Sequence, residues 1–222
     1  MLLYMDMDPL FFTIFIVAFI GSVILHEIAH GAVAYYYGDD TAKVAGRLSL
    51  NPLVHIDLVG SIVVPVLLFI SQSGFLFGWA KPVPVNPFRL KNGASAYRLV
   101  SLAGIATNLL LAVISALVLK VTIGNFGLTG ANLGVIFFGF MMQINLVLAI
   151  FNAMPFPGFD GWNFLSTFSG FSAIINKTPF GNPAFMAQYG FFISIFLIFI
   201  FMPVISSIFS YIFGLFISFF GL

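Results

Sequence analysis

The chain has 222 residues, of which 61% are hydrophobic and 7% are charged, and its mean hydropathy is +1.12. A soluble domain carries about 25% charged residues, so this composition excludes a water-soluble globule and predicts an integral membrane protein. The net charge of +1 offers no basic surface for nucleic acid, and the absence of cysteine excludes disulfides and thiolate metal ligands.

The first half of the chain begins with an apolar segment, residues 9–37, that is long enough to cross a membrane as a helix. Asp6 and Asp8 precede it where a signal peptide carries basic residues, so we expect no cleaved signal. The alternating pattern of residues 41–50 predicts short strands. Residues 58–77 are apolar again, and the proline-rich stretch GWAKPVPVNPFRLKNG that follows them is expected to be loop or extended chain.

The second half of the chain contains two further helix candidates, at residues 97–121 and 133–154. Residues 162–188 are polar enough to lie outside the membrane core. The last apolar run, 189–222, is too long for one ordinary span, and we expect Pro203 to divide it. These patterns predict an all-α integral membrane protein, a multi-helix bundle with about 4–6 membrane segments.

The HEIAH sequence in the first apolar segment places His26, Glu27 and His30 where ionisable side chains are costly. On a helix, positions i and i+4 share a face, so both histidines can turn a ring nitrogen toward one metal ion. Zinc suits imidazole ligands, and Glu27 beside them can take a proton from a water molecule at the metal. The alternative is a set of buried polar groups satisfied by neighbouring helices, but no base near Glu27 in the sequence offers it a partner.

A catalytic zinc site needs a third protein ligand, and the apolar segments offer few acids. Asp39 and Asp40 follow His30 by more than two helical turns and point off the end of that helix. Asp160 lies in FNAMPFPGFDG, where prolines and glycines unwind the chain and let a carboxylate turn inward. We therefore expect Asp160 to be the third ligand, although such an aspartate can also simply cap a turn.

Together, HEIAH, the AGIATN sequence at 103–108 and FNAMPFPGFDG resemble the site-2 proteases, which are intramembrane zinc metalloproteases. The resemblance covers about residues 15–165. It extends to LNPLVHID and FGWAKPVPVNP, as in compact members without PDZ or CBS domains. It implies one zinc ion held by His26, His30 and Asp160, with Glu27 as general base. It also implies that Asn152 polarises the scissile carbonyl.

Two positions depart from the family pattern, which usually has AGP where this chain has Ile105 and LDG where it has Phe159. Neither departure touches a ligand. Asn108, at the end of AGIATN, can make either a helix–helix hydrogen bond or a substrate contact. His55 in NPLVHID is expected to be a structural residue near the membrane surface, with a contact to the tetrahedral intermediate as the alternative.

The proposed ligands also predict the topology. The two histidines lie in the second half of the first helix, and Asp160 follows the helix at 133–154. To meet at one metal, these two helices must run in the same direction, and the helix at 97–121 must run the opposite way. The segment near 58–77 is then not a simple span, and we expect it to be re-entrant or to lie on the membrane surface.

The basic residues predict the orientation in the membrane. With this topology, seven of the eight basic residues fall on one side and only Lys120 on the other. The positive-inside rule assigns the crowded side to the cytoplasm. We therefore expect a multi-pass protein of the cell membrane, with its N-terminus outside and its zinc site open to the cytoplasm.

The sequence thus predicts a zinc endopeptidase that cleaves membrane proteins within or near their transmembrane segments. We expect one membrane domain over 1–222, with a catalytic core at about 9–165 and C-terminal segments at 189–222. Its expected partners are transmembrane protein substrates and the lipid bilayer, and no nucleic acid. The alternative is a non-proteolytic metal-binding protein, either a transporter or an inactive relative. A transporter should show inverted repeats, and the inactive relative should lack the base.

Overall fold

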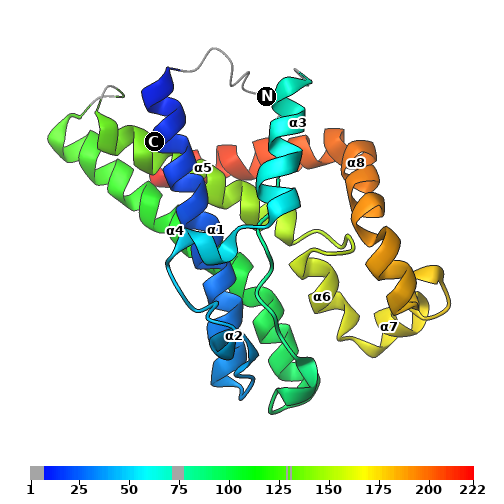
Figure 1. Ribbon diagram of the computed structural model, residues 1–222. Coiled ribbons are helices and arrows are strands. Elements are labelled where there is room, and N and C mark those ends of the chain that lie inside the picture. The colour runs from blue at the N-terminus through cyan, green and yellow to red at the C-terminus, as the bar shows by residue number, and fades with distance from the viewer. Residues whose placement is uncertain (1–7, 72–77, 129, 131) are drawn as a thin grey trace.

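The computed structural model describes residues 8–71, 78–128, 130 and 132–222, and these residues form a helical bundle (Figure 1). Within these ranges four helices are long and apolar enough to cross a membrane. They are α1 (Pro9–Tyr36), α4 (Gly93–Phe126), α5 (Leu133–Asn152) and the Phe192–Phe220 part of α8 (Pro183–Phe220). The predicted fold class is confirmed, and the chain is a multi-pass membrane protein.

The first helix begins where the sequence allows its free N–H groups to be capped. The Asp8 carboxylate accepts a hydrogen bond from the Leu10 N–H at 2.7 Å, and Pro9 occupies the first helical position, where no N–H is needed. The helix then continues for 28 residues to Tyr36. This agrees with the segment expected at 9–37.

The core of the bundle is formed by α1, α4 and α5, which pack against one another. Small side chains let these helices approach closely. Ala112 and Ala116 of α4 pack with Met142 and Leu146 of α5. On the other side of α5, Met141 and Ile144 pack with Ala18 of α1, a second interface. Both interfaces involve α5, so together they set the position of α4 against α1. This position determines which residues of α4 lie beside His26 and His30.

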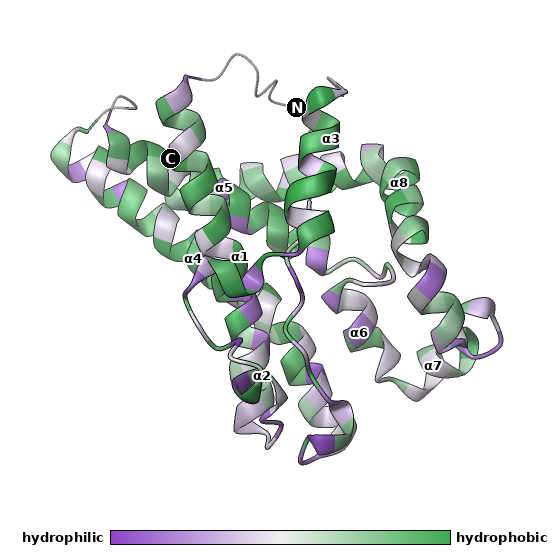
Figure 2. Ribbon diagram, in the orientation of Figure 1, coloured by the Kyte–Doolittle hydropathy of each residue, from purple (hydrophilic) through white to green (hydrophobic). Residues whose placement is uncertain are grey.

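The outer surface of the bundle is hydrophobic. Figure 2 shows apolar residues along the long helices and hydrophilic residues gathered mainly near α2 and the connecting loops. Many large side chains remain exposed on the helices, among them Val17 of α1, Leu110 of α4 and Phe199 of α8, which are 57%, 59% and 59% exposed. Such a surface suits contact with lipid rather than water.

The connection between α1 and α4 begins and ends in one place. The N–H of Lys91 donates to the carbonyl of Tyr37 at 2.7 Å, and Arg89 forms an ion pair with Asp40. Both ends of the connection therefore lie on the same side of the bundle. This relation was predicted from the proposed ligands, because α1 and α4 had to run in opposite directions.

The prediction of short strands at 41–50 is wrong. The Asp39 carboxylate accepts hydrogen bonds from the N–H and hydroxyl of Thr41, and the chain turns into the short helix α2 (Thr41–Val44). The N–H groups of Val44 and Arg47 then donate to the carbonyls of Asp40 and Ala42, which lie four and five residues earlier. These N–H groups are satisfied locally, and residues 41–50 form no ladder with another strand in the part of the chain that the structure describes.

The Asp39 carboxylate also ties this end of α1 to the far end of the connection, since it accepts a hydrogen bond from the Asn86 N–H at 2.6 Å. Burial by itself would raise the pKa of the Asp39 carboxyl. The hydrogen bonds from Thr41 and Asn86 and the positive charge of Arg89 outweigh burial and hold the pKa below its ordinary value of 3.8.

The apolar segment expected near 58–77 forms short helices. After the 3-10 turn η2 (Pro52–His55) come the π-helical segment η3 (Leu58–Val63) and α3 (Val64–Ile70). The apolar helical stretch described here runs from Leu58 to Ile70, which is shorter than a span of about 20 residues. Residues 72–77 lie outside the described residues. A short turn, η4 (Pro87–Arg89), then leads to α4.

The chain after α5 forms two short helices, α6 (Asp160–Ser166) and α7 (Ser169–Ile175), and the turn η5 (Pro179–Gly181) before α8.

The division expected at Pro203 is a change of direction rather than a break. Helix α8 is continuous through Pro203, and Figure 1 shows it turning part-way along its length. The hydroxyls of Ser206 and Ser207 donate to the Pro203 carbonyl at 3.1 and 2.8 Å, as is common near proline kinks.

Candidate metal centre and its surroundings

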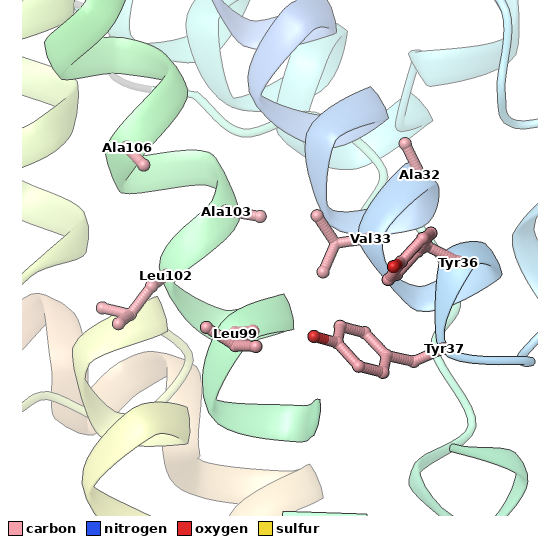
Figure 3. Close-up of a pocket in the computed structure, with 8 residues that line it drawn as sticks. All are labelled: Ala32, Val33, Tyr36, Tyr37, Leu99, Leu102, Ala103 and Ala106. Carbon is pink, nitrogen blue, oxygen red and sulfur yellow. The ribbon is translucent and has the colours of Figure 1, made fainter. Parts of the chain in front are cut away.

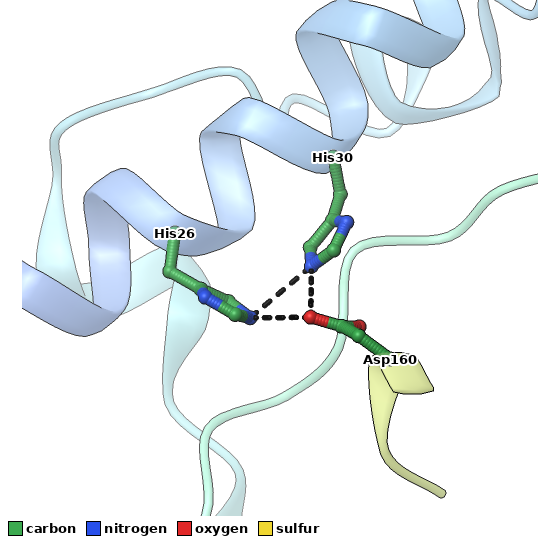
Figure 4. A group of neighbouring side chains, drawn as sticks. All are labelled: His26, His30 and Asp160. Carbon is green, nitrogen blue, oxygen red and sulfur yellow. Dashed lines mark hydrogen bonds and ion pairs between the residues drawn. The ribbon is translucent and has the colours of Figure 1, made fainter. Parts of the chain in front are cut away.

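The three predicted ligands lie together inside the bundle. His26 and His30 project from successive turns of α1 toward Asp160, the first residue of α6 (Figure 4). Their Nε2 atoms are 3.1 Å apart, and they lie 3.4 and 3.2 Å from Oδ2 of Asp160. All three residues are buried, with exposed fractions of 7%, 9% and 9%. The structure thus brings three metal-ligating atoms to one buried point.

The orientation of the His26 ring is set by a chain of hydrogen bonds across three helices. Nδ1 of His26 donates to Oδ1 of Asn108 at 2.5 Å, and Nδ2 of Asn108 donates to Oδ1 of Asn145 at 2.7 Å. Asn145 in turn donates to the Ser22 hydroxyl at 2.8 Å, and Ser22 donates to the Ala18 carbonyl. Because each group in this chain has one consistent role, the proton of His26 resides on Nδ1 and the lone pair on Nε2.

The His30 ring is fixed in the same way by α4. Its Nδ1 donates to the carbonyl of Val100 at 2.7 Å, which again leaves a lone pair on Nε2. Gly104, one helical turn further along α4, has no side chain to come between the two rings. A Cβ at this position would lie 2.4 Å from both Cε1 of His26 and Nε2 of His30. Only glycine therefore leaves the space between the imidazoles open.

The donor atoms of this cluster fit a zinc ion. Two imidazole lone pairs and a carboxylate oxygen face one another, and Oδ2 of Asp160 is a buried atom without a hydrogen-bond partner. These three electron-rich atoms repel one another. A proton on one imidazole would relieve only part of the repulsion, whereas a cation at their centre attracts all three atoms. Ligand atoms at zinc distances of 2.0–2.1 Å in a tetrahedral shell lie about 3.3 Å apart, close to the separations in this cluster.

The turn before α6 carries Asp160 to the cluster. Residues 153–159 are not regular helix, and Gly158 has a φ of +87°, which disfavours any other residue there. Gly161 lies against the end of α5, since a Cβ at this position would be 2.3 Å from the carbonyl oxygen of Ala153. The glycines of FPGFDG therefore allow the backbone to fold back tightly enough to bring the carboxylate inward.

Glu27, the predicted base, lies beside the cluster and is only partly buried. Its Oε2 accepts a hydrogen bond at 2.7 Å from the N–H of Val83, in the extended stretch before α4. Among the described residues no lysine, arginine or histidine forms an ion pair with it. The carboxylate is thus held by a backbone group through Oε2, and Oε1 forms no hydrogen bond with the part of the chain that the structure describes.

The structure does not bring the other predicted site residues into contact with the cluster, except for one. Asn152, the last residue of α5, donates to the Leu148 carbonyl of its own helix at 2.9 Å. His55 is buried in η2 and donates to the Ser49 carbonyl at 2.8 Å. Asn108 is the exception, because it bonds both His26 and Asn145 in the helix–helix arrangement given as one of its two predicted roles.

Sequence reasoning missed Asn145 and Gly104. A signal for Asn145 was present, since a polar residue in the middle of an apolar helix needs a partner, but its partner lies on another helix. Gly104 lies within the AGIATN pattern, which does not show what it faces. Its role depends on the position of α4 against α1, which the sequence alone does not determine.

An apolar groove of about 490 Å³ lies next to the metal centre, between residues 32–37 at the end of α1 and residues 99–106 of α4 (Figure 3). Val33 and Tyr37 extend the helical face that carries the two histidines. None of the three candidate ligands lines the groove. The groups able to do chemistry are therefore in the buried cluster, and the groove is an apolar recess beside it.

Comparison with known proteins finds relatives that are named as putative zinc metalloproteases. The chain is 43% identical over 153 residues to "Putative zinc metalloprotease YwhC" of Bacillus subtilis, a match that covers 68% of this chain and 66% of that protein. It is 34% identical over 157 residues to "Putative zinc metalloprotease Rip2" of Mycolicibacterium smegmatis, covering 69% of this chain and 56% of that protein. The Rip2 protein of Mycobacterium tuberculosis is 35% identical over 153 residues.

These matches leave part of each relative uncovered, since the chain spans about two thirds of YwhC and just over half of the two Rip2 proteins. No protein-family model and no solved structure match the chain. The relatives support a zinc metalloprotease with a zinc cofactor, and the residue patterns around the cluster agree with them. The chain therefore belongs to the site-2 protease family.

Proposed function

We propose that this chain is an intramembrane zinc endopeptidase that hydrolyses peptide bonds within or near the transmembrane segments of other membrane proteins. The observation that carries the proposal is the buried cluster of His26, His30 and Asp160, which lies among membrane-spanning helices with the carboxylate of Glu27 beside it. The catalytic groups all come from the predicted core at residues 9–165, within one membrane domain.

One zinc ion per chain would be held by Nε2 of His26, Nε2 of His30 and Oδ2 of Asp160. When bound, it would polarise the scissile carbonyl and make the attacking water more acidic. The chain's own residues prepare the site for this ion. Asn108 and the Val100 carbonyl keep the two imidazole protons on Nδ1, so both Nε2 lone pairs face the same point.

Glu27 would act as the general base and then as the general acid. Its Oε2 is held by the Val83 N–H, so Oε1 can accept a proton from the attacking water and return it to the leaving amine. The resemblance also assigns Asn152 to the oxyanion of the intermediate. In that role its amide would have to exchange the Leu148 carbonyl for the substrate oxygen.

The substrate would be a membrane segment that can unwind. In a regular helix each carbonyl is hydrogen-bonded and shielded by side chains, so a bond inside such a helix cannot reach a buried nucleophile. Glycine or proline near the cleaved bond weakens the helix locally. We expect the protein in the cell membrane, with its site open to the cytoplasm, because the predicted topology puts seven of the eight basic residues on that side.

The deciding experiment compares wild-type protein with Glu27→Gln in lipid vesicles. The probe is a labelled single-span peptide with a Gly-Gly pair in its apolar segment. The wild type should cleave this peptide, and the variant should keep its zinc but lose cleavage by at least about 100-fold. The control Asp40→Asn removes an exposed acid that pairs with Arg89 and should change neither property. Cleavage by Glu27→Gln at the wild-type rate would remove Glu27 as the base.

A further inference from the structure

The extended stretch at residues 79–85 donates backbone hydrogen bonds to the rest of the protein along one edge. The N–H groups of Trp79 and Lys81 donate to the carbonyls of Gly60 and His55 at 3.1 and 2.9 Å, and the N–H of Val83 donates to Glu27. Every second residue is thus hydrogen-bonded, as in an extended chain. We call residues 79–85 the strap.

The opposite edge of the strap cannot pair with another strand in a regular ladder. The alternate positions are occupied by Ala80, Pro82 and Pro84, and proline has no N–H to donate. Prolines on an outer edge protect it against strand addition. One contact of the inner edge, that of Val83, is therefore made to the catalytic centre, and the prolines leave the outer edge without a regular ladder for a substrate strand.

Arg47 holds the strap next to the contact with Glu27. Its guanidinium donates to the carbonyl of Lys81. In an extended chain, this carbonyl and the N–H of Val83 lie on the same edge, on either side of Pro82. Arg47 and Glu27 therefore bind neighbouring backbone groups of one short segment. The strap also packs closely against α1 here, since a Cβ on Gly31 would lie 3.0 Å from Cγ1 of Val83.

The surroundings of Arg47 are unusual for a charged residue. It is only 5% exposed, and its Nε atom is buried without a hydrogen-bond partner. Within the part of the chain that the structure describes, no carboxylate forms an ion pair with it. A guanidinium stays charged when buried, and burying it unpaired destabilises a protein. A neutral side chain would serve packing alone at lower cost, which indicates a use for this one.

We propose that Arg47 is a positioning residue for Glu27 and that it acts through the strap. By holding the Lys81 carbonyl it keeps the Val83 N–H directed at Oε2 of Glu27, and this leaves Oε1 facing the water to be activated. The proposal rests on the proposed function, because it assigns Glu27 as the base. It adds two groups that the predicted site did not include, the Arg47 side chain and the main-chain N–H of Val83.

The test is a double-mutant cycle on kcat for the Gly-Gly peptide. Arg47→Met removes the guanidinium, and Val83→Pro removes the N–H that binds Glu27. Each change should lower kcat by roughly 10- to 100-fold, as expected for groups that orient a catalytic residue. KM and zinc content should stay near their wild-type values. If Arg47 acts through the strap, the double variant should be no slower than the slower single variant.

Matched variants separate positioning from folding. Val83→Ala keeps the N–H and should be less impaired than Val83→Pro, and Arg47→Lys, which keeps the charge and one donor to Lys81, should be less impaired than Arg47→Met. An amide-to-ester replacement at residue 83 deletes only the N–H and substitutes for Val83→Pro if the proline variant loses zinc. Thermal melting of each variant shows whether the fold is kept.

Two results would overturn the proposal. One is a double variant in which the two losses multiply, because independent effects exclude action through the strap. The other is wild-type kcat in the ester variant or in Arg47→Met while Glu27→Gln abolishes cleavage. If Glu27→Gln itself retains cleavage, it is the proposed function that fails, so the two failures are distinguishable.

Discussion

Oδ1 of Asn108 on α4 accepts a hydrogen bond from Nδ1 of His26 on α1, at 2.5 Å. This contact decides which nitrogen of the imidazole is free for a metal, and it continues through Asn145 to α5. The three core helices are therefore joined at the metal centre by polar groups as well as by packing. The centre can be tested without changing any of the proposed ligands.

Replacing Asn108 should weaken zinc binding. In Asn108→Leu the Nδ1 proton of His26 loses its acceptor and Asn145 loses its donor, so the ring is free to rotate or to change tautomer. We expect zinc affinity to fall roughly 10- to 100-fold, the usual effect of removing a partner of a metal-bound histidine. Competition with a zinc-sensitive dye measures it. Asn125→Leu, at an exposed position near the end of the same helix, should leave the affinity unchanged. Equal affinities of all three proteins would contradict this role of Asn108.

Adding one methyl group at Gly104 should close the metal centre. The new Cβ of Gly104→Ala would lie 2.4 Å from atoms of both His26 and His30, so an imidazole must move or α4 must shift. We expect the purified variant to contain no zinc. Gly124→Ala is the control, because nothing lies within 4 Å of a Cβ at that position of α4, and alanine favours a helix by about 1 kcal/mol. A fully zinc-loaded Gly104→Ala protein would show that the gap between the rings is not needed.

Removing the metal should destabilise the fold around Asp160. Without a cation, Oδ2 of Asp160 is buried without a hydrogen-bond partner opposite two lone pairs. A chelator should therefore lower the melting temperature of the wild-type protein in detergent, and zinc at 100 times its Kd should restore about 2.7 kcal/mol of stability. Magnesium, which prefers oxygen ligands, should not. In Asp160→Asn the melting temperature should respond little to zinc, and a full zinc response in this variant would exclude Asp160 as a ligand.

The Asp39 carboxylate should make stability depend on pH in the acid range. Its pKa is lowered in the folded protein by the hydrogen bonds from Thr41 and Asn86 and by Arg89, despite its burial. Because the folded-state pKa is lowered, the stabilisation that the charged carboxylate gives the folded protein is fully present above the ordinary pKa of 3.8. It is lost as the pH falls through the folded-state pKa. Asp39→Asn should remove this dependence and lower stability at neutral pH.

Thermal melting of the metal-free proteins between pH 3 and 7 measures the effect of Asp39 apart from that of the zinc ligands. The control Asp40→Asn breaks an exposed ion pair with Arg89, and such pairs contribute little, about 0–1 kcal/mol. Parallel stability curves for Asp39→Asn and the wild type would contradict the role assigned to this carboxylate.

Much of the fold was predictable because the signals are local. The length of each apolar run defines the spans, so the helices expected at 9–37 and 133–154 agree closely with α1 and α5. Predictions failed where a side chain redirected the backbone. The alternation at 41–50 resembled strands, but hydrogen bonds from Thr41 to Asp39 turn the chain into a helix.

The helix ends were also harder to predict than the spans. The helix expected at 97–121 is longer at both ends, because it begins at Gly93, just after the Lys91–Tyr37 contact, and continues to a glycine cap at Gly127. Neither feature belongs to the hydrophobic pattern. One depends on a contact with a distant residue, and the other lies outside the apolar run.

The sequence by itself determined which three candidate metal ligands come together and which way their helices run. The four-residue spacing of His26 and His30 and the turn before Asp160 are properties of short segments. The apolar runs around them are so long that they must be membrane spans. Only the tertiary structure decided how the site is held. The contacts of Asn108 with His26 and of Val83 with Glu27 join residues 82 and 56 positions apart. Such contacts depend on how whole helices pack, which no local pattern records.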